Sequence, residues 1–190
     1  MPAPPSHAPA ATHTARGRLV WVDVARGLAL VPEDRQRDGL VQTMSVGQNL
    51  SLASIRNFTR GLFTSSRAER TLVDDSIRSV TVKTSGGGAP IGSLSGGNQQ
   101  KVVIGKMLAT NPRVIMLDEP SRGIDIGAKA EVFRTMRKLA AEGLGIVFVT
   151  SDMEELMALS DRIVVMSNGR VTGEFDRKDA TETLVIAASA

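Results

Sequence analysis

The sequence predicts an α/β fold, in which helices flank a mostly parallel sheet and a helical subdomain lies beside it. Two observations predict this class. After the Gly86–Gly88 loop, short apolar runs typical of strands alternate with helical stretches, which is the pattern of parallel α/β sheets. Before that loop, the segment from Ser45 to about Val80 has a helical pattern.

The chain starts with a segment rich in proline and alanine that lacks periodicity, and we expect residues 1–17 to be a disordered leader. This segment has no apolar core of the kind that a secretory signal needs. Residues 18–190 are then expected to form a single domain. Its first elements are two short apolar runs, Leu19–Val24 and Leu28–Val31, and both favour strands.

Two spacings typical of a capping box mark helix starts in the helical segment. Ser45 with Gln48, and Ser66 with Glu69, place a hydroxyl three residues before an amide or a carboxylate. Val114–Leu117 is continuously apolar, as expected for a strand buried on both faces. The other elements expected in the second half are a helix through Val102–Leu108, a helix Gly127–Glu142, a strand Gly145–Val149, a helix Met153–Leu159, a strand Arg162–Met166 joined by an Asn168-Gly169 hairpin turn to a strand Arg170–Phe175, and a helix Thr181–Ala188.

Composition excludes several kinds of site. The 190 residues include no cysteine, and the two histidines, His7 and His13, both lie in the leader. Thiolate metal sites, histidine-ligated metal sites and Ser-His-Asp chemistry are therefore excluded from the predicted domain. A net charge of +3, one Trp and no Tyr argue against a nucleic-acid partner. No apolar stretch approaches the ~20 residues of a membrane helix, so a membrane role would require a partner.

The string Leu94–Lys101 reads LSGGNQQK and precedes an apolar helix. A hydroxyl and two glycines at a helix start present bare amides and the positive end of the helix dipole to an anion. Glycine lets the backbone approach a phosphate closely. For Ser-Gly-Gly alone, the ordinary interpretation is a turn that caps a helix.

Two carboxylates, Asp118 and Glu119, end the predicted strand Val114–Leu117. The carboxyl edge of a parallel sheet is where α/β folds bind ligands. An isolated match of this kind is also compatible with a strand that ends in solvated acids. Ser121–Asp125 (SRGID) follows as a turn with a possible helix cap, and the charged string Val31–Leu40 (VPEDRQRDGL) has the composition of a solvated loop.

Together these strings resemble the ATPase subunits of ABC sugar importers (the ribose, xylose and galactose type), in particular their C-terminal cassette. LSGGNQQK is similar to the signature motif, VIMLDEP to Walker B, SRGID to the D-loop, and PEDRQRDGL to the stretch at the Q-loop region. The resemblance covers about residues 25–190 in family order. It implies that residues 18–190 are a partial nucleotide-binding domain with a helical subdomain at about 41–97.

The resemblance also implies roles. ATP and Mg²⁺ are the implied cofactors, with Asp118 holding Mg²⁺ and Glu119 orienting or deprotonating the attacking water. Asp125 would contact the facing subunit, and Ser151 would stand at the switch position. The residues implied in ATP binding are Ser95, Gly96, Gly97, Asn98, Gln99, Asp125 and Glu33. The implied partners are a second ABC cassette, transmembrane permease subunits and, indirectly, a sugar-binding protein, at the cytoplasmic face of the membrane.

The sequence departs from the family pattern at two places. The phosphate-binding string G-x-x-x-x-G-K-[ST] does not occur in it, and Thr150-Ser151-Asp152 has serine where cassettes carry a switch histidine. In ABC dimers, the phosphate loop of one cassette and the signature motif of the other hold each ATP. We therefore expect the isolated chain to be inactive. We expect its main function to be that its signature motif binds an ATP held by a partner cassette. Ser95→Arg should then abolish ATPase activity in a reconstituted complex, whereas Glu119→Gln should change it little.

The missing phosphate loop also predicts a folding problem, since the strand leading into that loop is a core strand of the family. Three or four buried aliphatic side chains contribute roughly 1.5–3 kcal/mol each. We expect the isolated chain to be marginally stable unless Leu19–Val24 replaces that strand. Two alternatives to an ATPase half stay open: a non-catalytic partner that completes or regulates another cassette's site, and a truncated gene product without function.

Overall fold

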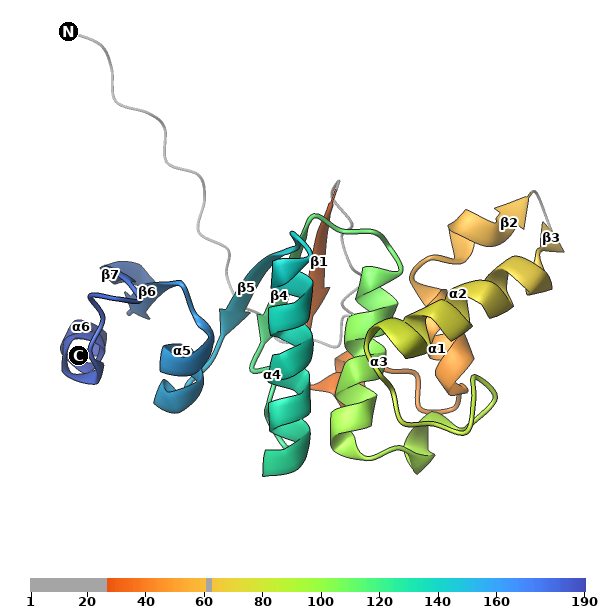
Figure 1. Ribbon diagram of the computed structural model, residues 1–190, viewed down its shortest axis with the longest axis horizontal. Helices are drawn as coiled ribbons and strands as arrows, with labels where there is room; N and C mark the ends of the chain where they lie inside the picture. Colours follow the sequence, from red (N-terminus) through yellow and green to blue (C-terminus); the bar gives the residue numbers. More distant parts are fainter. Residues whose placement is uncertain (1–26, 61–62) are drawn as a thin grey trace, which may run out of the picture.

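The computed structural model describes residues 27–60 and 63–190. The predicted leader and the predicted strand Leu19–Val24 lie outside the described residues. At the centre is a parallel sheet in the order β1 (Leu28–Val31), β4 (Val114–Asp118) and β5 (Gly145–Val149). Figure 1 shows the helical region on one side of this sheet and the C-terminal elements on the other.

The sheet buries one face, against α3 (Gly96–Leu108) and α4 (Ile126–Ala141). Ala29, Val31, Ile115 and Leu117 are buried on this face and belong to the main hydrophobic core. Alternate residues of β4 are only partly buried, and on β5 Val147 and Val149 are about half exposed. The expectation that Val114–Leu117 is buried on both faces is therefore wrong within the described residues, because helices cover only one side.

The helical region is less regular than its sequence pattern predicted. It consists of α1 (Val46–Leu52), a 3₁₀ turn (Ile55–Phe58), a two-stranded ribbon of β2 (Thr59–Arg60) and β3 (Phe63–Thr64), and α2 (Ser66–Ser79). The predicted continuous helical segment is thus interrupted by extended backbone. The ribbon is placed at the far end of the helical region, next to the start of α2 (Figure 1).

One predicted capping box is confirmed and the other is wrong. Ser45 Oγ accepts a hydrogen bond from the Gln48 amide, and Gln48 Oε1 accepts one from the Ser45 amide. On α2 the cap is Ser65, one residue earlier than predicted, and it accepts from the Ala68 amide. Glu69 is therefore not the reciprocal partner of the cap, and its carboxylate accepts from Ser51 Oγ of α1 instead.

Helix α3 lies at the centre of the fold, with α1, α2, α4 and β1 packed around it. Its fully buried side chains include Val102, Val103 and Ile104. Lys101 is buried too, and its ammonium pairs with Glu131 of α4 at 2.6 Å and donates to the Thr81 carbonyl at 3.1 Å. A charged group is stable at this depth only because it has partners.

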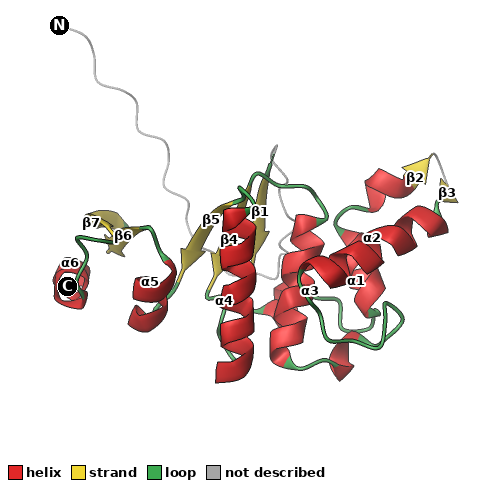
Figure 2. Ribbon diagram, in the orientation of Figure 1, coloured by secondary structure: helices red, strands yellow, loops and turns green. Residues whose placement is uncertain are grey.

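The C-terminal elements form a small unit of their own. After α5 (Met153–Leu159), β6 (Arg162–Ser167) and β7 (Arg170–Asp176) form an antiparallel pair, and α6 (Glu182–Ser189) packs on it. The predicted turn is confirmed: Asn168 and Gly169 have φ of 49° and 75°, as a tight two-residue hairpin requires. In the described structure β6 pairs only with β7, so the parallel sheet is smaller than the alternating pattern predicted (Figure 2).

The other predicted strands and helices of the second half are confirmed within one or two residues, apart from the start of the helix through Val102–Leu108. Among the described residues, none of the helices has both the length and the apolar character needed to cross a membrane.

Candidate functional site

The start of α3 is left without a side-chain cap. Ser45, Ser65, Asp125, Asp152 and Thr181 each cap the start of another described α-helix with a side-chain oxygen. At α3 the N-cap residue is Ser95, and its hydroxyl makes no such bond. The first-turn amides of this helix therefore have no side chain that occupies them.

The Ser95 hydroxyl is held by its neighbour instead. Asn98 Nδ2 donates to Ser95 Oγ at 3.0 Å, and Asn98 Oδ1 accepts from the Lys83 amide at 2.9 Å. Ser95 itself is exposed and Asn98 is half-buried. The side-chain amide of Asn98 thus fixes both the Ser95 side chain and the loop at Lys83 that precedes the motif.

The two glycines of the motif lie close to other parts of this chain, and packing requires glycine at Gly97. A Cβ on Gly96 would lie 2.7 Å from Arg35 Nη2, and a Cβ on Gly97 would lie 2.3 Å from the Ala128 Cβ on α4. Gln99 is buried, and its Nε2 donates to the carbonyls of Ile91 and Leu94. A direct contact between Gln99 and a nucleotide would require the side chain to leave these carbonyls.

The carboxyl edge of β4 carries the two predicted acids. Asp118 is the last residue of the strand and pairs with Val149 of β5. Glu119 follows with φ of +43°, a left-handed conformation that is uncommon for residues other than glycine. Its amide donates to the Val149 carbonyl at 2.9 Å, and its Oε1 accepts from the Ser151 amide at 2.8 Å. Glu119 and Ser151 are thus brought together, and the contact is made through the serine backbone.

The segment Ser121–Asp125 is held from both sides. From the loop after β1, Glu33 forms an ion pair with Arg122, and Arg35 donates to the carbonyls of Arg122 at 2.7 Å and Gly123 at 3.0 Å. Partial burial lowers the pKa of the Arg35 guanidinium from its ordinary value. The string Val31–Leu40, predicted to be a solvated loop, contains a π-helical turn at Arg35–Gly39 that Asp34 caps.

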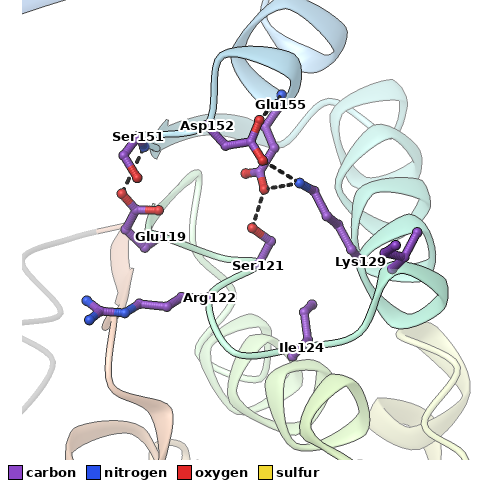
Figure 3. Close-up of a pocket in the computed structure, with 9 residues that line it drawn as sticks. Glu119, Ser121, Arg122, Ile124, Lys129, Ser151, Asp152 and Glu155 are labelled. Atoms are coloured by element: carbon purple, nitrogen blue, oxygen red, sulfur yellow. Dashed lines mark hydrogen bonds and ion pairs between the residues drawn. The ribbon is translucent and has the colours of Figure 1, made fainter.

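On its other side this segment opens onto a pocket of about 420 Å³. Glu119 and Ser151 lie at its rim, and Lys129 of α4 reaches across to Asp152 and Glu155 at 2.6 Å each (Figure 3). Hydrogen bonds to Asp152 and then Glu155 raise the pKa of Lys129, and the bond from Lys129 lowers the pKa of Asp152. Asp125 lies at the end of the segment, where it caps α4 by accepting from the Ala128 amide at 2.9 Å.

The predicted site residues therefore fall into two groups, joined by a residue that the sequence analysis missed. Ser95 and Gly96 lie at the start of α3, and Glu119 and Ser151 lie at the sheet edge. Arg35 contacts Gly96 and also binds the Ser121–Asp125 segment. No local pattern indicates the hydrogen bonds from Arg35 to this segment, because their partners lie 87 and 88 positions away in the sequence.

Glu155 was missed as well, although a spacing marked it. Asp152 and Glu155 have the spacing of a capping box, and the Glu155 amide does donate to Asp152 Oδ1 at 3.1 Å. That spacing locates Glu155 on the first turn of α5. The partners of its carboxylate depend on the tertiary structure, since they lie on other segments of the chain.

The donor set at the end of β4 is compatible with Mg²⁺. This ion keeps several waters and binds proteins through one or two carboxylates together with substrate phosphates. Asp118 is half-buried, and no hydrogen bond or ion pair within residues 27–60 and 63–190 holds its carboxylate. The same ranges contain no cluster of three or more acidic, histidine or cysteine ligands.

Comparison with known proteins decides the family. The family model described as "ABC transporter" matches residues 13–122, more than half of the chain. The chain belongs to the ABC transporter family. Among curated proteins, this ABC chain is 50% identical over 166 residues to the ribose import ATP-binding protein RbsA of Rhodopirellula baltica, which covers 87% of the chain and 32% of that protein. It is 45% identical over 166 residues to the xylose import ATP-binding protein XylG of Pseudomonas syringae pv. tomato, covering 87% of the chain and 31% of that protein.

The ABC chain thus spans about a third of the length of the curated relatives it matches. Its fold is also that of solved cassettes. A dimeric post-hydrolysis structure of the ATP-binding cassette MJ0796 with ADP and Pi aligns with a TM-score of 0.66 at 24% identity, over 80% of this chain and 63% of that one. CbiO1 of Clostridium perfringens, part of the ABC transporter complex cbiONQ, aligns with a TM-score of 0.67 at 23% identity, over 83% of this chain and 63% of that one. The incomplete ABC-ATPase fold predicted from the sequence is confirmed.

Proposed function

We propose that this ABC chain supplies one half of an ATP-hydrolysing site in a carbohydrate importer. Its contribution is the signature motif at Leu94–Lys101, the acids at the end of β4, and the D-loop at Ser121–Asp125. The carbohydrate assignment is supported by the names of the ribose and xylose import proteins to which the chain is similar.

The observation that carries the proposal is the uncapped start of α3. A serine followed by two glycines begins a helix whose first amides have no side-chain partner, while the rest of that helix is buried in the core. A helix start of this kind binds phosphate oxygens through its amides and its dipole. In the proposed dimer, the phosphate comes from an ATP whose other contacts are made by the facing cassette.

The roles follow from where each side chain lies. Ser95 and the amides of Gly96 and Gly97 bind the terminal phosphate. Asn98 positions the Ser95 hydroxyl, and Gln99 holds the preceding turn rather than the nucleotide. Asp118 would hold Mg²⁺ through water, and the ion would supply positive charge to the phosphates.

At the sheet edge, Asp118, Glu119 and Ser151 belong to the second, degenerate site of the dimer. Glu119 orients the attacking water there, and hydrolysis of the ATP at Ser95 does not depend on it. One of its carboxylate oxygens accepts from the Ser151 amide, which leaves the other oxygen to accept from water. The attack forms a phosphorus–oxygen bond and breaks the bond to the leaving diphosphate oxygen. A serine hydroxyl at position 151 cannot take up and return a proton near neutral pH, so Glu119 works without the switch histidine that other cassettes have.

The proposed partners are a second cassette, which faces Ser95 and Asp125, and a permease, which faces the region from the Val31–Leu40 string through residues 45–57. A sugar-binding protein would act on the permease rather than on this chain. The complex is then placed at the cytoplasmic face of the membrane.

The test compares two substitutions in a complex of this chain with a facing cassette and permease in lipid vesicles. Ser95→Arg places a long cation at the uncapped helix start and is expected to abolish ATP hydrolysis. Glu119→Gln is expected to change hydrolysis little. Ser93→Arg, an exposed position two residues earlier, is the matched control and should retain wild-type activity. The opposite ranking of Ser95→Arg and Glu119→Gln would reject the proposal.

A second candidate is a non-catalytic partner that completes or regulates the site of another cassette. The serine at position 151 favours it, because proton transfer there is lost. Binding of radiolabelled ATP to the purified chain distinguishes the two candidates. Binding by the chain alone favours the ATPase half, and binding only in the presence of the facing cassette favours the partner.

A further inference from the structure

Glu155 is a buried acid to which the proposed mechanism gives no role. It lies on the first turn of α5 and its exposed fraction is 2%. A carboxylate at this depth is costly unless its oxygens accept hydrogen bonds. Here they accept from three different parts of the chain.

The three donors come from the D-loop, from the end of β5 and from α4. Oε1 accepts from the Ser121 hydroxyl and from Lys129 Nζ, and Oε2 accepts from Thr150 Oγ1 at 2.9 Å. Figure 3 shows the carboxylate between Ser121 and Lys129, below the start of α5. One side chain thus joins segments that lie up to 34 residues apart in the sequence.

These contacts close a ring around the catalytic acid. Glu119 is two residues before Ser121, and Ser151 directly follows Thr150. The Glu119 carboxylate bonds to the Ser151 amide, while Ser121 and Thr150 are joined through Glu155. The ends of β4 and β5 are therefore connected on both sides of Glu119, and a shift of either end would change the direction of its carboxylate.

The charges around Glu155 allow its own charge to be removed without leaving a buried cation unpaired. Lys129 is shared between Glu155 and Asp152, so the cluster holds two carboxylates and one ammonium. Asp152 is more exposed than Glu155 and already caps α5. If Glu155 lost its charge, Lys129 would keep Asp152 as its counter-ion, and no buried cation would be left without a partner.

We propose that Glu155 is a positioning residue, which holds the D-loop and the end of β5 in a fixed register and so aims the Glu119 carboxylate. Its effect on hydrolysis depends on the proposed function. Its effect on the Ser151 amide does not, because that amide belongs to the ring itself.

The first experiment follows amide exchange by NMR in the full chain without nucleotide. Glu155→Gln keeps the shape of the side chain but replaces an acceptor with a donor. We expect the Ser151 amide to exchange at least ~10-fold faster, because the end of β5 moves away from Glu119. Glu154→Gln is the matched control: it removes the same charge from the neighbouring, exposed position and should leave Ser151 unchanged. The Ile104 amide, in the buried helix α3, reports on unfolding of the whole molecule.

The second experiment applies the same exchange measurement to the Thr150 side of the ring. Thr150→Val removes one hydroxyl of the ring and should speed exchange at Ser151 as Glu155→Gln does, whereas Thr150→Ser keeps the hydroxyl and should leave exchange at the wild-type rate. Combining Thr150→Val with Glu155→Gln should speed exchange little further than Glu155→Gln alone.

The outcomes separate the two proposals. Faster exchange at Ser151 in a chain that never hydrolyses ATP supports the positioning role and rejects the proposed function. Unchanged exchange at Ser151 in both Glu155→Gln and Thr150→Val overturns the positioning role. An equal increase in exchange at Ser151 and Ile104 also overturns it, because Glu155 would then contribute only to global stability.

Discussion

The start of α3 and the carboxyl edge of β4 and β5 both contribute to the proposed cassette dimer, but they are built in different ways. Helix α3 is fixed by packing: its core is buried, and Gly97 lets it lie directly against Ala128 of α4. The sheet edge is fixed by polar bonds between loops, in which the Glu119 carboxylate and the Ser151 amide are both at an open rim.

This difference predicts which changes each region tolerates. A packed helix tolerates no added volume, since close-packed interiors have no spare space. An edge built from hydrogen bonds tolerates a new side chain as long as the donors and acceptors remain.

The largest effect is expected from Gly97→Ala. The new Cβ would lie 2.3 Å from the Ala128 Cβ, so α3 must move away from α4. Alanine in a helix normally adds stability, but here the change should lower the free energy of unfolding by about 3 kcal/mol. Urea denaturation followed by circular dichroism measures it. Gly92→Ala, with no atom within 4 Å of the new Cβ, is the control. Adding Ala128→Gly should restore part of the stability, and no recovery would contradict the packing argument.

A smaller effect is expected at the ion pair between α3 and α4. Glu131→Gln leaves the buried Lys101 ammonium without its counter-ion, and should cost about 2 kcal/mol of unfolding free energy. This value is below the range for fully buried pairs because the Glu131 side chain is 30% exposed. Glu142→Gln, in an exposed pair on the same helix, should have little effect. If Lys101→Met added to Glu131→Gln lowered stability further, rather than recovering it, the cost would not come from the uncompensated charge.

The same carboxylate predicts a pH dependence. Hydrogen bonds from Lys101 and then Lys83 lower the pKa of Glu131 from 4.5 to about 2. A group with a depressed folded-state pKa stabilises the fold fully above its unfolded pKa, and loses that contribution as the pH falls toward the folded value. The stability difference between the wild type and Glu131→Gln should therefore shrink between about pH 4.5 and pH 2. Urea denaturation at several pH values measures this difference. A gap that stays constant over this interval would be inconsistent with the ion pairs.

The smallest effect is expected from Ser151→Ala. The bond to Glu119 uses the backbone amide of Ser151, which alanine retains. The free energy of unfolding should stay within about 0.5 kcal/mol of the wild type, and ATP hydrolysis by the vesicle complex should be unchanged. A large loss of activity in Ser151→Ala would show that the hydroxyl takes part in the reaction.

The sequence predicted most elements because their signals are local. The apolar runs of β4 and β5, the hairpin turn at Asn168-Gly169 and the capping box at Ser45 each depend on neighbouring residues only. The errors arose where tertiary contacts override a local pattern. Glu69 has the spacing of a capping partner, but its carboxylate bonds to Ser51 of another helix. β6 follows a helix as a parallel strand would, but it pairs with β7 and not with the described sheet.

The sequence by itself determined the family, the order of the motifs and the identity of the residues at the start of α3 and the end of β4. Only the tertiary structure decided how these parts are joined. Arg35 binds the D-loop from 87 residues away, Glu155 bonds to Ser121 across 34, and Lys101 pairs with Glu131 across 30. Long-range pairing of polar side chains depends on which helix and strand ends the packing brings together, and a linear pattern of residues carries no signal for that.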